Sequence, residues 1–183
     1  MDGLWVFLPV LGAFLVHGPV LRFDLVPQLK RPLDGGTKFR GRRLFGDNKT
    51  WRGVLAMFAG VLVATVALAQ WPDYWRHLPS AIQRTSPWIT GALIGLGVVL
   101  AELPNSFLKR QLGIAPGAQE RSALGIAFAI FDQGDFVLGV WLLLAPIWFM
   151  SPAQAAVAFV VVALIHFAIN LVGYAVGART SWL

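Results

Sequence analysis

The chain contains no cysteine and few charged residues. Its 183 residues include 15 lysines and arginines but only nine aspartates and glutamates, so charged side chains make up 13% of the sequence. The absence of cysteine excludes disulfides and thiolate metal sites, although it does not identify a compartment. The shortage of acids leaves a formal net charge of +6, which indicates anionic partners such as lipid headgroups, nucleotides or nucleic acid.

Apolar residues are abundant instead: they make up 57% of the chain, and the mean hydropathy is +0.66. A helix needs about 20 mostly apolar residues to cross the hydrocarbon layer of a membrane. The fourth candidate span, residues 136–150, is short, and an earlier start near Leu124 would carry Asp132 and Asp135 into the bilayer or a cavity at its edge. We therefore expect one all-α domain over residues 1–183, a polytopic membrane protein with about five transmembrane helices. The candidate spans are residues 4–21, 54–70, 88–107, 136–150 and 153–176.

The distribution of positive charge predicts how the chain crosses the membrane, because lysine and arginine concentrate on the cytoplasmic side. Residues 22–52, the basic loop, hold nine of the 15 cations against three acids, whereas residues 71–87 hold two cations. Placing the basic loop in the cytoplasm predicts an outside N-terminus and a cytoplasmic C-terminus that carries Arg179. We therefore predict a multi-pass protein of the cell (inner) membrane with its active-site loops in the cytoplasm.

The basic loop ends in Gly-Asp-Asn-Lys-Thr-Trp-Arg-Gly at residues 46–53. On charge alone it could be a topology signal with anionic-lipid attraction, worth roughly 1 kcal/mol per cation near the surface. However, Lys49 and Thr50 directly precede an apolar helix, and free N–H groups at a helix start favour phosphate. The glycine spacing before Lys49 differs from that of a Walker A loop. The pattern therefore favours a phosphate site of another kind.

A second group of polar residues lies at the end of the third candidate span. Glu102, Ser106 and Arg110 are spaced by four and share one face if the helix continues, and Lys109 lies beside them. The two cations could simply snorkel to the interface. An acid inside a span, however, costs a few kcal/mol unless it is paired or hydrated. This face is therefore a candidate polar site.

Asp132 and Asp135 form a third group, inside apolar sequence. Two carboxylates three residues apart can approach one another on a single helical turn. Magnesium is usually held by one or two carboxylates together with substrate phosphates and water. The alternative is that both acids cap a helix N-terminus. We favour metal binding.

Two further features are weaker. His166, Asn170 and Tyr174 recur every four residues along the last span, a pattern that indicates interhelical hydrogen bonds more often than catalysis. His17, which Gly18 and Pro19 follow, predicts a helix break in the first span.

Three blocks together resemble one enzyme family. They are GRRLFGDNKTWRG at residues 41–53, NSFLKR at 105–110 and FDQGDFVLG at 131–139. In this order they are similar to the CDP-archaeol synthases, CTP-dependent lipid cytidylyltransferases related to phosphatidate cytidylyltransferases. The C-terminal segment with His166, Asn170, Tyr174, Gly177 and Trp182 is also similar. Asn48 and Gly134 depart from the family, which usually has Gly and often has Leu there.

The resemblance implies transfer of a cytidylyl group from CTP to a membrane lipid phosphate, archaeol-phosphate-like or phosphatidate-like, giving CDP-lipid and pyrophosphate. It implies Mg²⁺ as cofactor, with CTP, the lipid phosphate and membrane lipids as partners and no nucleic acid; homo-oligomerisation stays open. The predicted catalytic residues are Lys49, Lys109, Asp132 and Asp135, of which Asp132 and Asp135 bind the metal, with Asp47 as a further candidate ligand. The predicted substrate-binding residues are Arg42, Arg43, Asp47, Thr50, Arg52, Ser106 and Arg110.

Two other functions are alternatives to cytidylyl transfer. A non-enzymatic small membrane transporter or scaffold with an anionic-lipid-binding basic loop would explain the loop and the spans, but not the acids within the spans. A CDP-alcohol phosphotransferase is less favoured, because that chemistry uses an Asp-rich repeat and the chain has none.

The topology can be tested by cysteine labelling, since the chain has no cysteine of its own. With Gly36→Cys or Asp73→Cys, an impermeant thiol reagent applied to intact cells should label position 73 and leave position 36 unlabelled. The opposite result would reverse the predicted orientation.

Overall fold

The computed structural model describes residues 2–115 and 123–175, so Gly177, Arg179 and Trp182 lie outside the described residues. Five helices in this part are long and apolar enough to cross a membrane, as predicted. The first span joins the 3-10 helix η1 to α1. The elements of the five spans are η1 (Asp2–Val10) with α1 (Leu11–Arg22), α2 (Trp51–Leu68), α5 (Pro87–Gln111), α6 (Ala123–Leu144) and α7 (Pro152–Ala175).

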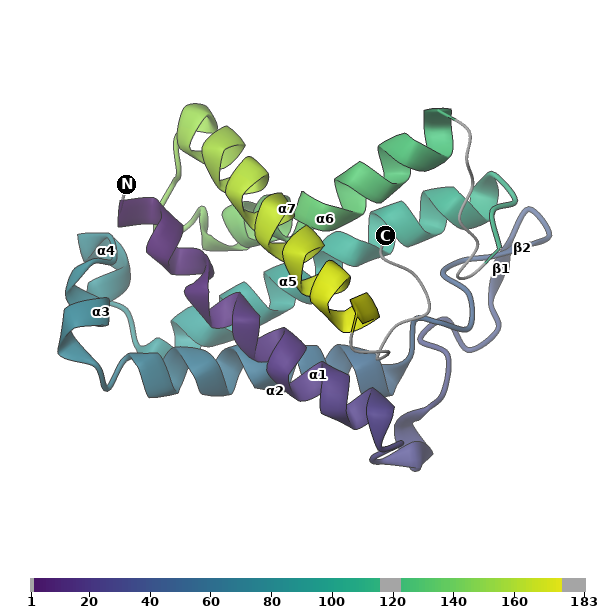
Figure 1. Cartoon of the computed structure of the whole chain (residues 1–183), viewed down its shortest axis with the longest axis horizontal. Coiled ribbons are helices and arrows are strands. Elements are labelled where there is room, and N and C mark those ends of the chain that lie inside the picture. The colour runs from purple at the N-terminus through teal and green to yellow at the C-terminus, as the bar shows by residue number, and fades with distance from the viewer. Residues whose placement is uncertain (1, 116–122, 176–183) are drawn as a thin grey trace.

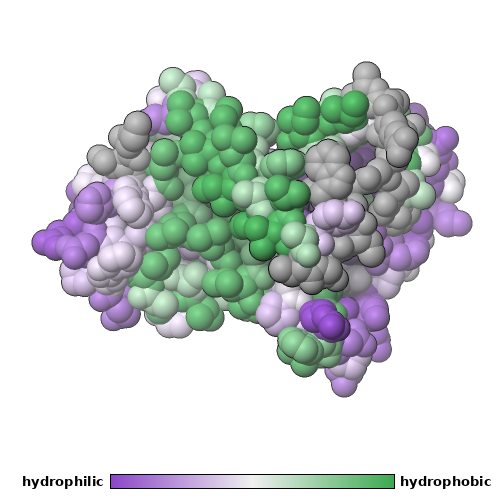
Figure 2. Space-filling model, viewed as in Figure 1, coloured by the Kyte–Doolittle hydropathy of each residue, from purple (hydrophilic) through white to green (hydrophobic). Residues whose placement is uncertain are grey.

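Two hydrophilic ends enclose an apolar middle (Figures 1 and 2). One end is formed by two short helices, α3 (Pro72–Arg76) and α4 (Ser80–Gln83). The other is formed by the basic loop, which contains η2 (Pro27–Leu29) and a hairpin of β1 (Lys38–Phe39) and β2 (Arg42–Arg43). The predicted all-α membrane fold is confirmed, and this hairpin is a small addition to it.

The structure corrects two of the local predictions. The fourth span, α6, runs from Ala123 to Leu144 rather than over residues 136–150, so the earlier start near Leu124 is confirmed. Asp132 and Asp135 therefore lie inside a helix, and the alternative that they cap its N-terminus is wrong. The predicted break at Gly18 and Pro19 is also wrong, since α1 runs through both to Arg22. Membrane helices tolerate such residues because neighbouring helices, side chains and local adjustments of the helix satisfy the backbone groups that a proline frees.

Close contacts between glycines hold neighbouring spans together. A Cβ built on Gly97 of α5 would lie 2.7 Å from the Val140 nitrogen of α6, and one built on Gly12 of α1 would collide with Gly60 of α2. Small residues let membrane helices approach closely, because packing rather than water exclusion drives their association. The most extensive contact is between α5 and α6, and it fixes which of their polar residues face each other.

The hairpin is a tight one that positions the end of the basic loop. Lys38 pairs with Arg43 and Phe39 with Arg42, so Arg40 and Gly41 form the connecting turn. Both turn residues have positive φ, +50° and +80°, as a two-residue turn of type I′ requires. The chain then returns to α2, which begins after the N-cap residue Thr50.

Candidate active site

A cluster of charged and polar side chains forms where α5, α6 and the residue before the α2 cap meet. Lys49 forms an ion pair with Glu102 of α5, and Lys109 of α5 forms one with Asp132 of α6. These pairs join residues 53 and 23 positions apart in the sequence. The structure therefore brings together all four residues predicted to be catalytic, and Glu102 joins them.

Lys49 reaches this cluster because the backbone around it is fixed. Its carbonyl accepts a 2.7 Å hydrogen bond from Leu33, and the Thr50 side chain accepts one of 3.1 Å from the Gly53 N–H. A threonine at this position satisfies one of the free donors at a helix start. The predicted Lys-Thr pair ahead of a helix is confirmed, with the Thr50 hydroxyl acting as the cap.

Lys49 stays a cation in this setting. Burial by itself would lower the pKa of Lys49, but the neighbouring carboxylates of Glu102, Asp132 and Asp135 outweigh burial and raise it. A protonated lysine is a point charge suited to phosphate oxygens. Lys49 can therefore bind an anion but cannot serve as a base at neutral pH.

Asp135 is the most unusual member of the cluster. It is 1% exposed, and neither of its carboxylate oxygens accepts a hydrogen bond from a described residue. The side-chain oxygen of Asn105 is likewise buried without a donor, although the amide nitrogen of Asn105 donates to Asp132. Buried acceptors without donors are costly unless a cation or a proton compensates them. Asp135 and Asn105 therefore each carry buried acceptor oxygens that no described residue satisfies.

The donor set is compatible with a hard cation but does not enclose one. Among residues 2–115 and 123–175, no three His, Asp or Glu side chains converge as metal ligands. Magnesium commonly takes only one or two carboxylates and fills its other positions with water and substrate phosphates. Asp132 keeps 44% of its side chain exposed, so the cluster remains open to a phosphate ligand.

The polar residues of α7 support α6 beside the cluster. The Asn170 amide donates to the Gln133 side chain at 3.1 Å, and a ring nitrogen of His166 lies 3.3 Å from the Gln133 carbonyl. These bonds confirm the interhelical role predicted for His166 and Asn170, whereas Tyr174 is exposed. A Cβ at Gly134 would lie 2.7 Å from the Phe159 ring of α7, which explains why a small residue stands there.

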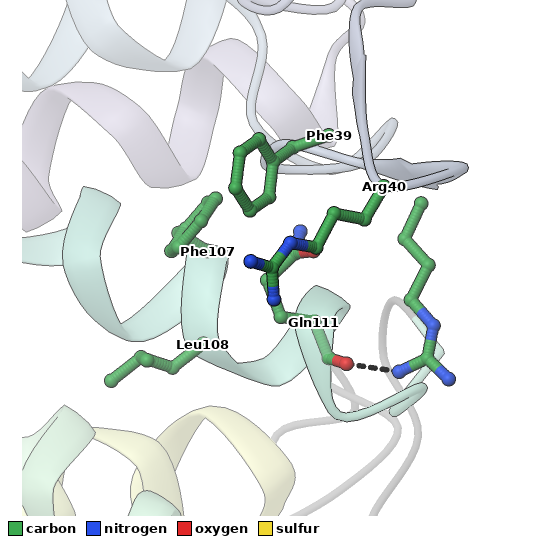
Figure 3. Close-up of a pocket in the computed structure, with 6 residues that line it drawn as sticks. Phe39, Arg40, Phe107, Leu108 and Gln111 are labelled. Atoms are coloured by element: carbon green, nitrogen blue, oxygen red, sulfur yellow. Dashed lines mark hydrogen bonds between the residues drawn. The ribbon is translucent and has the colours of Figure 1, made fainter.

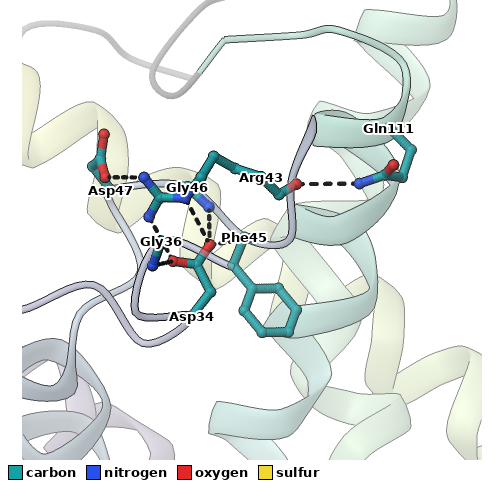
Figure 4. Close-up of polar contacts among 7 residues, drawn as sticks. All are labelled: Asp34, Gly36, Arg43, Phe45, Gly46, Asp47 and Gln111. Carbon is teal, nitrogen blue, oxygen red and sulfur yellow. Dashed lines mark hydrogen bonds and ion pairs between the residues drawn. The ribbon is translucent and has the colours of Figure 1, made fainter. Parts of the chain in front are cut away.

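Asp34 organises the basic loop (Figure 4). Its carboxylate accepts hydrogen bonds from the backbone N–H groups of Gly36, Phe45 and Gly46 at 3.0–3.1 Å and pairs with Arg43. Burial opposes the charge, but these donors outweigh burial and hold the pKa of the Asp34 carboxyl well below its usual range. The loop therefore folds around one buried anion.

The basic-loop residues that were predicted to bind substrate have partners within the protein. Arg43 pairs with Asp34 and with the exposed Asp47, while Arg42 donates to the Gln111 carbonyl. Arg52 is buried, pairs with Asp24 and donates to the Leu25 carbonyl. On α5, Ser106 and Arg110 are half-buried. Substrate binding by Arg42, Arg43, Asp47, Thr50, Arg52, Ser106 and Arg110 stays a prediction.

Two residues of the cluster and its supporting loop, Asn105 and Asp34, are not singled out by the sequence analysis. Asn105 could have been found, because an amide next to Ser106 interrupts an apolar span four residues from Lys109. Asp34 carried one signal, the Asp-Gly-Gly sequence typical of a turn, but nothing in the sequence pairs it with Arg43.

Comparison with known proteins bears directly on this cluster. The family model described as CarS-like, CDP-archaeol synthase, matches residues 4–183. The chain belongs to the CDP-archaeol synthase family. The resemblance and the enzyme class predicted from the sequence, a CTP-dependent cytidylyltransferase, are thereby confirmed.

Individual relatives cover most of the chain. The CDP-archaeol synthase of Thermococcus kodakarensis is 31% identical over 179 residues, 96% of this chain and 94% of the relative. That of Halobacterium salinarum is 36% identical over 157 residues, 81% of each chain. A solved structure, described as an intramembrane enzyme for archaeal membrane lipids biosynthesis, is 31% identical, with a TM-score of 0.66 over 91% of both chains.

The role of Asp34 yields a prediction about the loop. Because its folded pKa is depressed, its contribution to stability is complete above the unfolded value near 4 and is lost as the pH falls below it. Asp34→Asn should therefore lower local stability at neutral pH by about 1.5–3 kcal/mol, the usual value of hydrogen bonds to a charged group. Hydrogen exchange at Phe45 and Gly46 would show it.

Asp47→Asn is the matched control, since Asp47 also pairs with Arg43 but is exposed. It should leave exchange at Phe45 and Gly46 near the wild-type rate. Equal exchange in wild type and Asp34→Asn would show that the loop does not depend on the buried carboxylate.

Proposed function

We propose that the chain transfers a cytidylyl group from CTP to a membrane lipid phosphate of the archaeol type, releasing CDP-lipid and pyrophosphate. The observation that carries the proposal is the cluster at the α5–α6 contact. It combines two lysines with carboxylates at the end of a membrane span, where a soluble nucleotide and a lipid headgroup can meet. Family membership and the relatives' names support the same reaction.

The chemistry asks for positioning and charge rather than for a strong base. A lipid phosphate oxygen forms a bond to the α-phosphorus of CTP, and the bond from that phosphorus to the pyrophosphate oxygen breaks. The attacking oxygen is already anionic, so the barrier comes from bringing two anions together and from the charge on the leaving group. Cations placed where this charge develops stabilise the transition state.

Lys49 and Lys109 are the cations available for this task. In the structure each is neutralised by a carboxylate, Glu102 or Asp132. Phosphate oxygens compete for these lysines with the carboxylates, so a bound substrate receives charge-assisted hydrogen bonds that are already aimed into the site. The carboxylates hold the lysines in place when substrate is absent.

Asp135 and Asp132 are the residues that would hold Mg²⁺. The buried acceptor oxygens of Asp135 have no hydrogen-bond donor among residues 2–115 and 123–175, and Asp132 lies one helical turn away on α6. When bound, the ion would screen the incoming anion and stabilise the departing pyrophosphate. Asn105, whose amide nitrogen donates to Asp132, carries a further buried acceptor oxygen.

An apolar groove between the first span, α6 and α7 suits the lipid chains. It has a volume of about 360 Å³, within the roughly 300–1,000 Å³ usual for ligand sites. It reaches α6 at Phe136, next to Asp135, and α7 at His166, which also contacts Gln133. A lipid with its phosphate at the cluster can therefore extend into an apolar space. The groove is lined by Leu4, Trp5, Phe7, Leu8, Val10, Leu11, Phe14, Phe136, Val161, Val162, Ile165 and His166.

An assay with purified protein tests the reaction and its lipid. Labelled CTP, magnesium and an ether-linked archaeol phosphate should give CDP-lipid and pyrophosphate in equal amounts. Ester-linked phosphatidate should be used more slowly, because the relatives are CDP-archaeol synthases. CTP turnover that does not depend on any lipid phosphate would contradict the proposal.

The metal assignment has its own test. Asp135→Asn keeps the side-chain shape but removes the charge that a metal ion needs, so cytidylyl transfer should fall by orders of magnitude. Independently of activity, magnesium with CTP should raise the melting temperature of the wild type but not that of Asp135→Asn, because a bound ligand stabilises only the protein that binds it.

Asp73→Asn removes a carboxylate at the opposite end of the molecule, where Asp73 pairs with Arg76, and serves as the control. It should retain both the activity and the magnesium-dependent shift. A well-folded Asp135→Asn protein with a normal rate across a magnesium titration would overturn the metal assignment.

A further inference from the structure

A second cavity lies between the hairpin and the end of α5 (Figure 3). Its volume is about 530 Å³, again within the range of ligand sites. It is lined by Phe39, Arg40, Arg42, Phe107, Leu108 and Gln111. The lining combines two arginines with two aromatic rings and a leucine.

This cavity faces away from the candidate active site. On α5, Asn105 and Lys109 are one turn apart, and both contact Asp132 of α6. Phe107 follows Asn105 by two residues, a rotation of about 200° around the helix, and Gln111 lies one turn beyond Phe107. Phe107 and Gln111 therefore lie on the side of α5 opposite the Asp132 contacts, and the cavity is separate from the cluster.

The polar part of the cavity is built to receive an anion. The Arg40 guanidinium lies 5.3 Å from the centre of the Phe39 ring, and that ring lies 5.9 Å from the Phe107 ring. Arg42 donates to the Gln111 carbonyl, which attaches the hairpin to α5. Guanidinium groups present several donors in a plane and match phosphate geometry. A phosphate is therefore the chemistry that the two arginines favour.

The apolar part of the cavity continues a lipid-facing stripe. Leu96, Leu100 and Leu108 are 41%, 45% and 49% exposed and lie on an inclined row of residues four apart, which turns by about 120° around α5 between Leu96 and Leu108. An exposed apolar face on a membrane span contacts lipid chains. Leu108 belongs to both the stripe and the cavity, so a ligand here has an anionic head and an apolar chain.

We propose that this cavity binds the phosphate headgroup of an anionic membrane phospholipid that is not consumed, with its chain along the Leu96–Leu108 stripe. The bound lipid attaches the hairpin to the membrane surface. Because Arg43 of the same hairpin pairs with Asp34, the lipid also stabilises the loop that leads to Lys49. The proposal does not depend on the cytidylyl-transfer reaction.

Native mass spectrometry of the purified full chain in detergent tests it by titration with phospholipids. Phosphatidylglycerol should be retained more tightly than zwitterionic phosphatidylcholine. Arg40→Gln should weaken phosphatidylglycerol binding about fivefold, the equivalent of one cation near a membrane surface. Lys38→Gln removes the same charge from the same hairpin outside the cavity and should leave binding unchanged. Leu108→Asn should weaken binding by removing chain contacts.

Three other results would each overturn the proposal. Equal losses for Arg40→Gln and Lys38→Gln would indicate diffuse surface charge. If soluble glycerol phosphate competed for the site as strongly as phosphatidylglycerol does, the cavity would be a site for free phosphate. Arg40 has a φ of +50°, so Arg40→Asn serves as a second variant suited to that backbone, and wild-type binding by both Arg40 variants would exclude the site.

Discussion

The close contact between α5 and α6 is the constraint on which the candidate active site depends. Gly97 and Gly139 have no side chains, so the two helices approach until a Cβ on either would collide with the other. At this separation Asn105 and Lys109 of α5 reach Asp132 of α6. A larger residue at either glycine would move the two polar faces apart, although neither glycine touches the cluster.

The charges of the cluster are only partly compensated within the protein. Lys49 and Lys109 are each paired with a carboxylate, which leaves Asp135 as a buried carboxylate to which no residue in the described part of the chain donates. In an apolar membrane span such a group is costly, and residues of this kind mark functional sites. Under the proposed function, a metal–nucleotide complex would bring positive charge to Asp135 and negative charge to the lysines.

The basic loop has a structural role as well as an electrostatic one. Asp34 gathers three backbone N–H groups and Arg43, and Arg52 closes the loop against Asp24 at the end of α1. Several of the cations that attract anions by their charge therefore also hold the loop together through ion pairs. This double use explains why a cation-rich segment can hold Lys49 at one position rather than remain a diffuse surface charge.

Local features of this protein were determined by its sequence alone. The five spans, the helix start after Thr50 and the placing of Glu102, Ser106 and Arg110 on one helix follow from neighbouring residues, because hydropathy, capping and helical periodicity act over a few positions. These predictions need no sequence motif. The start of α6 was ambiguous, because Asp132 and Asp135 interrupt the apolar sequence that would form its first turns.

Only the tertiary structure decided which charges meet. Lys49 pairs with Glu102 across 53 residues, Arg52 pairs with Asp24, and Asp34 lies at the centre of the loop. These contacts depend on how each helix is rotated toward its neighbours. In lipid that rotation is set by close packing of small residues and not by an apolar stripe, because the lipid-facing surface is as apolar as the core. The sequence pattern therefore named the candidate site residues, and glycine-mediated packing decided their partners.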